Sequence, residues 1–229
     1  MPTPCKPADK TAIRDAATVI LWRPGPRGPE VLMGQRGASA AFMPDKFVFP
    51  GGAVDAGDAR VKLAGGPDGT CLRRLAMEAD PSCIPALLAG AIRELWEETG
   101  LILGQPATWQ APSPDWAGFA AAGFAPSARG FSFVFRAITP PGRSRRFDAR
   151  FFLVPATAVR GDAEDFSRAG DELRHLQWIP LAQARDFDLP FITTVVLAEL
   201  PPLITAGGQP RSVPFVRNDD IVSGITRLA

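Results

Sequence analysis

Short apolar runs separated by turn-forming segments cover most of the chain. Alternating or continuous apolar runs are typical of β-strands, and apolar residues at helical spacing are typical of amphipathic helices. Strands are predicted over residues 16–22, 31–36, 47–54, 131–139, 145–154, 176–180 and 213–217. Helices are predicted over residues 71–79, 84–100, 113–122 and 191–200, with another beginning at residue 181. Strands and helices therefore interleave, which predicts an α/β or α+β fold with a mixed sheet.

Proline and glycine mark where several of these elements should end. Residues 23–30 (RPGPRGPE) separate the first two strands and predict a hairpin. Residues 60–70 are rich in glycine and predict a loop, while Pro201 and Pro202 predict the end of the helix that precedes them. Because no internal repeat or low-complexity linker divides the chain, residues 1–229 are expected to form one domain.

Composition and charge narrow the classes of partner. Hydrophobic residues make up 46% of the chain and charged residues 21%, and the formal net charge is +1, which does not favour a nucleic-acid or anionic-membrane partner. No apolar run approaches the length of a membrane span, and the first ten residues lack the apolar region of a secretory signal. We therefore expect a cytoplasmic protein that acts on a small molecule, with its oligomeric state left open.

The supply of reactive side chains excludes several mechanisms. His175 is the only histidine, no GxSxG motif supplies a serine nucleophile, and no GxxxxGK[ST] loop is present. Three cysteines without CxxC spacing favour a reducing compartment and disfavour a cysteine zinc site. Carboxylates and arginines are what remain for chemistry.

The segment RELWEETG, residues 93–100, carries the densest group of carboxylates. At helical spacing Glu94, Glu97 and Glu98 share one face, opposite an apolar stripe of Leu88, Ile92, Leu95 and Trp96. Gly100 follows at the position of a helix C-terminal glycine. Like charges placed in this way repel each other, so the face is either a solvated helix surface, with Arg93 pairing to Glu97, or a site for a cation.

These residues, taken with those before them, resemble the Nudix hydrolase family. Phe49–Gly52 (FPGG), the acid Asp58 and the continuous run from Arg93 to Leu101 follow the order of the family's sequence box. The chain departs from the box in two ways. Asp58 stands where the family has glutamate, and residues 59–92 fill a gap that the family spans with seven residues, so a segment of about 59–85 is inserted.

The resemblance implies both a fold and a site. The expected fold is an α/β/α sandwich with a mixed sheet and an inserted helical segment before the catalytic helix. The expected activity is metal-dependent hydrolysis of a pyrophosphate in a nucleoside diphosphate linked to another moiety, with Mg²⁺ or Mn²⁺ as cofactor. The implied metal ligands are Glu94, Glu97, Glu98, the carbonyl group of Gly52 and, as an additional acid, Glu172. Glu94 is alternatively the base, and Arg93 is expected to pair with Asp58.

Three further segments, FMPDKFVFPGGAVDAGD, RRFDARFFLVPA and DELRHLQWIPL, resemble a long-insertion subgroup that includes peroxisomal coenzyme A diphosphatases. The subgroup's pattern before the box is matched at Leu32, Arg36 and 49–52 but not at Gly37, Ala41 and Asp45. Coenzyme A or an acyl-coenzyme A is therefore the expected substrate, with dinucleotides or nucleotide sugars as alternatives. A Nudix-fold binding or regulatory module without catalysis is the rival interpretation.

Two groups of residues complete these expectations. Arg36 and Arg146 are candidates for substrate binding, and Arg143, Arg145 and Arg150 could also contact substrate phosphates or could instead lie on a solvated strand edge. His175 is expected to be a surface histidine rather than a base. The inserted segment, about 61–82, is expected to lie outside the core sheet as a helical flap that shapes substrate access.

Overall fold

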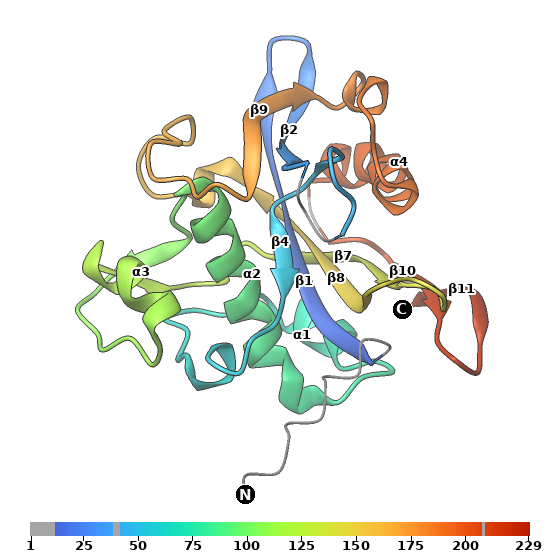
Figure 1. The fold of residues 1–229 in the computed structure, drawn as a ribbon, viewed down its shortest axis with the longest axis horizontal. Coiled ribbons are helices and arrows are strands. Elements are labelled where there is room, and N and C mark those ends of the chain that lie inside the picture. Colours follow the sequence, from blue (N-terminus) through green and yellow to red (C-terminus); the bar gives the residue numbers. More distant parts are fainter. Residues whose placement is uncertain (1–11, 39–41, 208) are drawn as a thin grey trace, which may run out of the picture.

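The computed structural model describes residues 12–38, 42–207 and 209–229. The N-terminal segment considered above for a signal sequence and the Ala41 position lie outside these ranges. Figure 1 shows a large sheet with helices on both faces. The predicted α/β/α sandwich with a mixed sheet is therefore confirmed.

The sheet within the described residues has nine strands, of which seven follow one path and two pair with strands of that path. The main path runs β11-β10-β7-β8-β1-β2-β3, while β4 pairs with β1 and β9 pairs with β2. The strands are β1 Ile13–Gly25, β2 Gly28–Arg36, β3 Phe47–Val48, β4 Gly51–Ala53, β7 Ser132–Ile138, β8 Arg146–Pro155, β9 Leu173–Pro180, β10 Val213–Asn218 and β11 Ser223–Leu228. The pairs β1–β8 and β7–β10 are parallel and the other pairs are antiparallel, which makes the sheet mixed.

In the part of the chain that the structure describes, four α-helices lie on the two faces of the sheet. One face carries α1 Gly69–Leu75 and α2 Ile84–Thr99, with α3 Ala117–Ala121 beside a small two-stranded sheet of β5 Gly104–Pro106 and β6 Phe124–Pro126. The opposite face is covered by α4 Phe191–Thr205 (Figure 1). Each face has its own apolar core, because alternate residues of the central strands point to opposite sides: Val19 and Phe152 face α2, whereas Ile20 and Phe151 face α4.

The inserted segment forms part of the core, so the expectation of a flap outside it is wrong. Cys71 and Leu75 of α1 are 0% and 2% exposed and belong to the core on the α2 side of the sheet. Val61, at the start of the segment, belongs to the same core. Helix α1 begins at Gly69 because the side chain of Asp68 caps it by accepting a hydrogen bond from the Cys71 backbone N–H at 2.8 Å.

Two predicted helix boundaries are wrong for identifiable reasons. Helix α4 continues through Pro201 and Pro202 to Thr205, where the last turn is closed by bonds to the carbonyl groups of residues 201 and 202. Proline lacks the backbone N–H that donates within a helix, but its carbonyl group can still accept a hydrogen bond. Pro201 and Pro202 therefore still accept the bonds of the last turn, and the helix continues past them. The helix predicted from residue 181 is only a 3₁₀ turn, Ala184–Asp186.

Strand β8 is not a solvated edge of the sheet, which was one alternative for its arginines. It lies between β7 and β1 in the middle of the sheet, and Arg146, Asp148 and Arg150 are at most 9% exposed. The carboxylate of Asp148 accepts hydrogen bonds from both Nε and Nη2 of Arg136 at 2.9 and 2.7 Å, and Arg150 pairs with Asp15. Burial of these charges is tolerated because each has an opposite partner.

Candidate functional site

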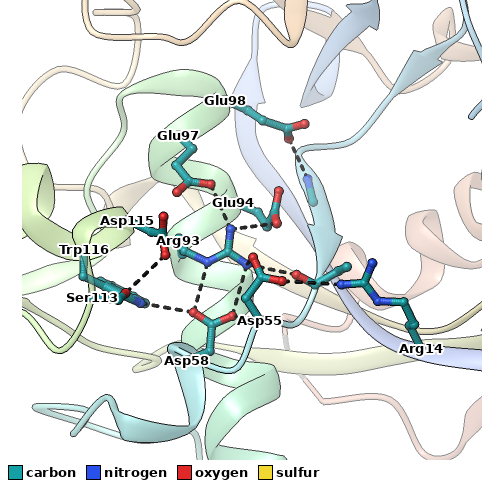
Figure 2. A network of polar contacts seen from close by, with 12 residues as sticks. Arg14, Asp55, Asp58, Arg93, Glu94, Glu97, Glu98, Ser113, Asp115 and Trp116 are labelled. Carbon is teal, nitrogen blue, oxygen red and sulfur yellow. Dashed lines mark hydrogen bonds and ion pairs between the residues drawn. The ribbon is translucent and has the colours of Figure 1, made fainter. Parts of the chain in front are cut away.

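Helix α2 positions the glutamates through its packing. Its apolar residues, including Leu88, Ile92 and Leu95, are buried against the sheet, which fixes the rotation of the helix and the direction of the opposite face. The helix ends where expected, at Gly100, whose φ of 74° favours glycine and whose N–H donates to the Trp96 carbonyl at 2.8 Å. The three glutamates therefore lie in the last two turns, facing the β4 segment (Figure 2).

Glu98 is the most deeply buried of the three glutamates. It is 2% exposed, and its Oε2 accepts a hydrogen bond from the backbone N–H of Gly51 at 2.8 Å. Gly51 can approach so closely because its φ of 154° suits glycine and a Cβ there would lie 2.5 Å from the Ala17 carbonyl oxygen. The other carboxylate oxygen of Glu98, Oε1, is buried and has no hydrogen-bond partner among the residues that the structure describes.

Glu94 lies against the second glycine of the pair. A Cβ at Gly52 would be 2.5 Å from the Glu94 carboxyl carbon, so only glycine leaves room for this side chain. Burial raises the pKa of Glu94 to about 7, and the neighbouring charge of Glu97 adds to this shift, while Arg93 opposes it. Burial also raises the pKa of Glu98 well above its usual value, with a further contribution from Glu94.

Arg93 is the cation at the centre of the cluster (Figure 2). Its Nη1 donates to Glu94 Oε1 at 2.9 Å and to Glu97 Oε2 at 2.8 Å, so the expected i, i+4 pair is present. Its Nε and Nη2 donate to the two oxygens of Asp58 at 3.0 and 3.1 Å, which confirms the expected pairing of these residues. Nη2 also donates to the carbonyl of Ala53 at 2.9 Å, which ties the guanidinium to β4.

The burial of this face excludes a simply solvated helix surface. Only the Glu97 side chain is substantially exposed, at 38%, whereas the side chains of Glu94 and Arg93 are 13% and 4% exposed. One guanidinium is shared among Asp58, Glu94 and Glu97 and makes no hydrogen bond to Glu98. Buried carboxylates without a counterion are unfavourable, so the arrangement requires either protonation or a cation.

Glu94, Glu97 and Glu98 offer carboxylate oxygens, which are the ligand atoms that hard divalent cations prefer. The buried and unpartnered Glu98 Oε1 is a free ligand atom of the type that Mg²⁺ and Mn²⁺ prefer. In the described residues, no group of three or more acidic, cysteine or histidine side chains is already arranged around one point. The reason is visible in Figure 2, where Glu94 and Glu97 turn to Arg93 while Glu98 turns to Gly51.

Two of the other predicted residues lie near the glutamates. The charge of Arg36, at the end of β2, lowers the pKa of Glu98 against the raising effect of burial, and the charge of Glu172 raises it. The charge of Glu172 also raises the pKa of Glu94. The buried Nε of Arg36 has no hydrogen-bond partner in the described residues. Arg36 pairs with Leu173, the residue after Glu172, in the β2–β9 ladder, and the Gly170 N–H donates to the Glu97 carbonyl at 2.8 Å, so this part of the chain lies beside the C-terminal end of α2.

The remaining candidates lie elsewhere. Arg146 is 5% exposed and is held by Asp220 at 2.7 Å and by the carbonyl groups of Thr139 and Asn218, so its guanidinium makes no contact with the glutamates. Arg143 and Arg145 are exposed in the turn before β8, and Arg150 pairs with Asp15. His175 is exposed on β9, as expected of a surface histidine, with a positive φ of 51°.

Comparison with known proteins bears directly on this geometry. No family model matches the chain. The chain is 38% identical over 104 residues to nudix hydrolase 7 of Caenorhabditis elegans, covering 44% of this chain and 27% of that protein. It is 33% identical over 136 residues to acyl-coenzyme A diphosphatase NUDT19 of Gallus gallus, covering 44% of this chain and 36% of that protein. The matches thus span between 27% and 36% of these relatives' lengths.

A solved structure extends the similarity to most of the chain. The crystal structure of a Nudix hydrolase from Alicyclobacillus acidocaldarius superposes with a TM-score of 0.62 and 29% identity, over 82% of this chain and 90% of that one. This chain is similar to Nudix hydrolases in sequence and in fold. The glutamate helix and the glycine pair lie at the positions where the chain resembles the Nudix sequence box, and the segment that contains α1 separates them in the sequence.

Two residues that contact Asp58, Trp116 and Asp55, were not predicted from the sequence to belong to this cluster. Trp116 donates from its indole Nε1 to Asp58 Oδ1 at 3.1 Å, and Asp55 donates from its backbone N–H to Asp58 Oδ2 at 2.9 Å. The Asp55 carboxylate lies 3.6 Å from Arg93 and pairs with Arg14 at 3.4 Å. One indication was present in the sequence, namely aspartate at position 58 where the resembled pattern has glutamate. It did not identify Trp116 and Asp55 as hydrogen-bond donors to that aspartate.

The buried glutamates predict how the metal-free protein responds to pH. Because the pKa of Glu94 is raised to about 7, the folded protein retains a proton that the unfolded chain releases near pH 4.5. The free energy of unfolding should therefore fall as pH rises from about 4.5 through 7. We expect the melting temperature in EDTA to drop by roughly several °C between pH 5 and pH 8.

A matched substitution checks the origin of this pH effect. In Glu94→Gln the decrease between pH 5 and pH 8 should become smaller, whereas it should persist in Glu164→Gln, which alters a side chain that is 62% exposed. A melting temperature that rises over this interval in the wild-type protein would contradict the proposed protonation. Differential scanning calorimetry at a series of pH values makes the measurement.

Proposed function

We propose that the protein is a metal-dependent Nudix pyrophosphohydrolase that cleaves the pyrophosphate of a nucleoside diphosphate linked to another moiety. The observation that carries the proposal is the buried glutamate face of α2, which lies against Gly51 and Gly52 with one carboxylate oxygen of Glu98 unpartnered. Such a face is unfavourable unless a cation binds to it. Similarity to Nudix hydrolases supports the same reaction class.

The residues that would hold Mg²⁺ or Mn²⁺ are Glu94, Glu97, Glu98, the carbonyl group of Gly52 and Glu172. When bound, the metal would polarise a pyrophosphate oxygen and offset the charge that develops at the phosphorus under attack by water. Arg93 would remain on Asp58 when the glutamates turn away from it, which keeps one positive charge beside the site.

Glu94 is the better placed general base among the three. Its carboxylate lies beside Gly52 and within hydrogen-bonding distance of Arg93, and a cation bound to the neighbouring glutamates would keep it ionised and able to accept a proton. Glu98 is more suited to fixed ligation because the Gly51 N–H already orients it. Arg36 lies near Glu98 with its Nε unpartnered, which suits an arginine that binds a substrate phosphate.

We propose coenzyme A or an acyl-coenzyme A as the substrate. The relative from Gallus gallus is an acyl-coenzyme A diphosphatase, and the pattern before the box matches that subgroup at Leu32 and Arg36. Ala41 stands where the subgroup carries an arginine, so one phosphate contact of that pattern is absent from the sequence. Dinucleotides and nucleotide sugars are the alternative substrates, because they present the same pyrophosphate.

A Nudix-fold binding or regulatory module is the alternative from another class. Such a module does not need the carboxylates of the box. This chain carries Glu94, Glu97 and Glu98, buries Glu94 and Glu98, and leaves Oε1 of Glu98 without a hydrogen-bond partner in the described residues. The catalytic proposal therefore accounts for more of the structure.

The setting is proposed to be the cytoplasm, with a small-molecule partner. None of the helices in the part of the chain that the structure describes has the length and apolar character needed to cross a membrane. The proposed reaction requires neither a nucleic acid nor a membrane.

A substrate panel tests the proposal. With Mn²⁺ or Mg²⁺ present, we expect hydrolysis of coenzyme A and an acyl-coenzyme A to 3′,5′-phosphorylated adenosine and the corresponding phosphopantetheine. Values of kcat/KM for these two compounds, NADH and ADP-ribose should be compared, with products identified by mass spectrometry. A tenfold or greater preference for NADH or ADP-ribose, about 1.4 kcal/mol in transition-state stabilisation, would reject coenzyme A as the substrate. No turnover of any of them would favour the binding module.

A further inference from the structure

Asp58 is a fully buried carboxylate, 0% exposed, that joins two parts of the site. Its two oxygens accept hydrogen bonds from Nε and Nη2 of Arg93, at 3.0 and 3.1 Å. The Asp55 backbone N–H and the Trp116 indole provide the two other donors, at 2.9 and 3.1 Å. These donors and the guanidinium together give both carboxylate oxygens of Asp58 two hydrogen bonds each.

Trp116 is itself rigidly held. It is 0% exposed, and its ring packs edge-on against Phe119 and Trp109, with centroids 5.5 and 5.9 Å apart. It ends the 3₁₀ turn Pro114–Trp116 that leads directly into α3. The indole N–H is therefore fixed by packing, and Figure 2 shows it donating to Asp58 next to Arg93.

The contacts continue from Asp58 to the glutamates. Arg93 uses one edge of its guanidinium for Asp58 and directs Nη1 to both Glu94 and Glu97. If these glutamates turn to a cation, Arg93 loses two of its partners and keeps Asp58, the Ala53 carbonyl and the Asp55 carboxylate, which lies 3.6 Å away. Anchoring of Asp58 therefore decides whether Arg93 stays in place or follows the carboxylates and competes with the cation.

We propose that Trp116 is a positioning residue of the metal site, acting through Asp58 and Arg93 to leave Glu94 and Glu97 available to a divalent cation. This proposal rests on the metal-dependent function proposed above. It goes beyond the Nudix box because Trp116 lies outside the box, in the segment that leads into α3. The indole hydrogen bond, rather than the bulk of the ring, carries the effect.

The experiment measures binding of Mn²⁺ alone to the full chain by electron paramagnetic resonance, without substrate. In Trp116→Phe the ring is retained in large part and the N–H is lost. We expect the dissociation constant for Mn²⁺ to rise about three- to tenfold. This is less than the increase expected when a residue that hydrogen-bonds directly to a metal ligand is replaced, because Trp116 acts through Asp58 and Arg93. The matched control is Trp109→Phe, because the Trp109 indole donates to the Phe124 carbonyl at 2.7 Å and makes no hydrogen bond to Asp58.

A role in packing alone would lower the melting temperature of both variants without separating their Mn²⁺ affinities. The proposal is therefore overturned if Trp116→Phe binds Mn²⁺ within twofold of the wild type, or if both variants weaken equally. A double variant adds an independent readout: if the indole acts through Asp58, then Asp58→Asn combined with Trp116→Phe should bind no more weakly than Asp58→Asn alone. Should Asp58→Asn fail to fold, the comparison of the two tryptophan variants decides.

The wild-type measurement separates the two proposals. If the wild-type protein does not bind Mn²⁺, the proposed metal-dependent function fails, and the role of Trp116 fails with it. If the wild type binds Mn²⁺ and the tryptophan variants do not differ, only the role of Trp116 is rejected.

Discussion

Glu98→Gln is expected to remove most of the turnover while leaving the fold intact. The substitution keeps the shape of the side chain and an oxygen for the Gly51 N–H, but it removes the negative charge at the buried and unpartnered Oε1. A loss in kcat on the order of 10³ or more is expected, because several kcal/mol of transition-state stabilisation would be lost with the cation. Steady-state kinetics on the best substrate of the panel measures this loss.

Stability gives a second readout for the same variant. Burial raises the pKa of Glu98 well above its usual value, so ionisation at pH 8 opposes folding when no metal is present. The melting temperature of Glu98→Gln in EDTA should therefore equal or exceed that of the wild type. The gain in melting temperature on adding Mg²⁺ should be much smaller in the variant.

A matched surface substitution controls for the general effect of losing one carboxylate. Glu164→Gln changes a side chain that pairs with Arg23 and is 62% exposed, so its kcat should stay close to the wild-type value. Wild-type turnover by Glu98→Gln would show that the site has been assigned to the wrong residues. Precipitation or loss of the folded state in Glu98→Gln would argue that the carboxylate is structural.

The sequence predicted the site better than its surroundings, and the reason is physical. The spacing of Glu94, Glu97 and Glu98 is read within one helix, where backbone geometry alone determines which residues share a face. The glycine pair at 51–52 is also local, since glycine is needed where backbone and carboxylate approach closely. Such features depend on neighbours in the sequence, so they can be predicted without the tertiary structure.

The errors concern residues whose partners are distant in the sequence. Arg150 of β8 pairs with Asp15 of the adjacent strand β1, which allows Arg150 to be buried where a solvated strand edge was one of the alternatives. Arg146 finds its partner Asp220 more than seventy residues later. Trp116 reaches Asp58 across a similar interval. Only the tertiary structure brings these groups together, which is why periodicity could not predict them.

The burial of α1 leads to the second large expected effect. Leu75 is 2% exposed in the core on the α2 side, so Leu75→Ala should lower the free energy of unfolding by about 2–5 kcal/mol through lost burial and a residual cavity. For a chain of this size the melting temperature should fall by roughly 5–15 °C. Leu72→Ala on the same helix is the control, because Leu72 is 38% exposed and its truncation should cost less than about 0.5 kcal/mol.

Replacing residues 61–82 with a short glycine and serine linker should have a still larger effect. It would remove Cys71 and Leu75 from the core and take away the carbonyl groups of Met77 and Glu78, which accept hydrogen bonds from buried Arg136 at 3.3 and 3.0 Å. Arg136 would keep Asp148, yet the uncovered face of β7 would be exposed to water. We expect no stable, soluble protein from this deletion. Recovery of a monodisperse variant with a wild-type melting temperature would instead establish that the segment is a dispensable flap, as the position of the insertion in the sequence first indicated.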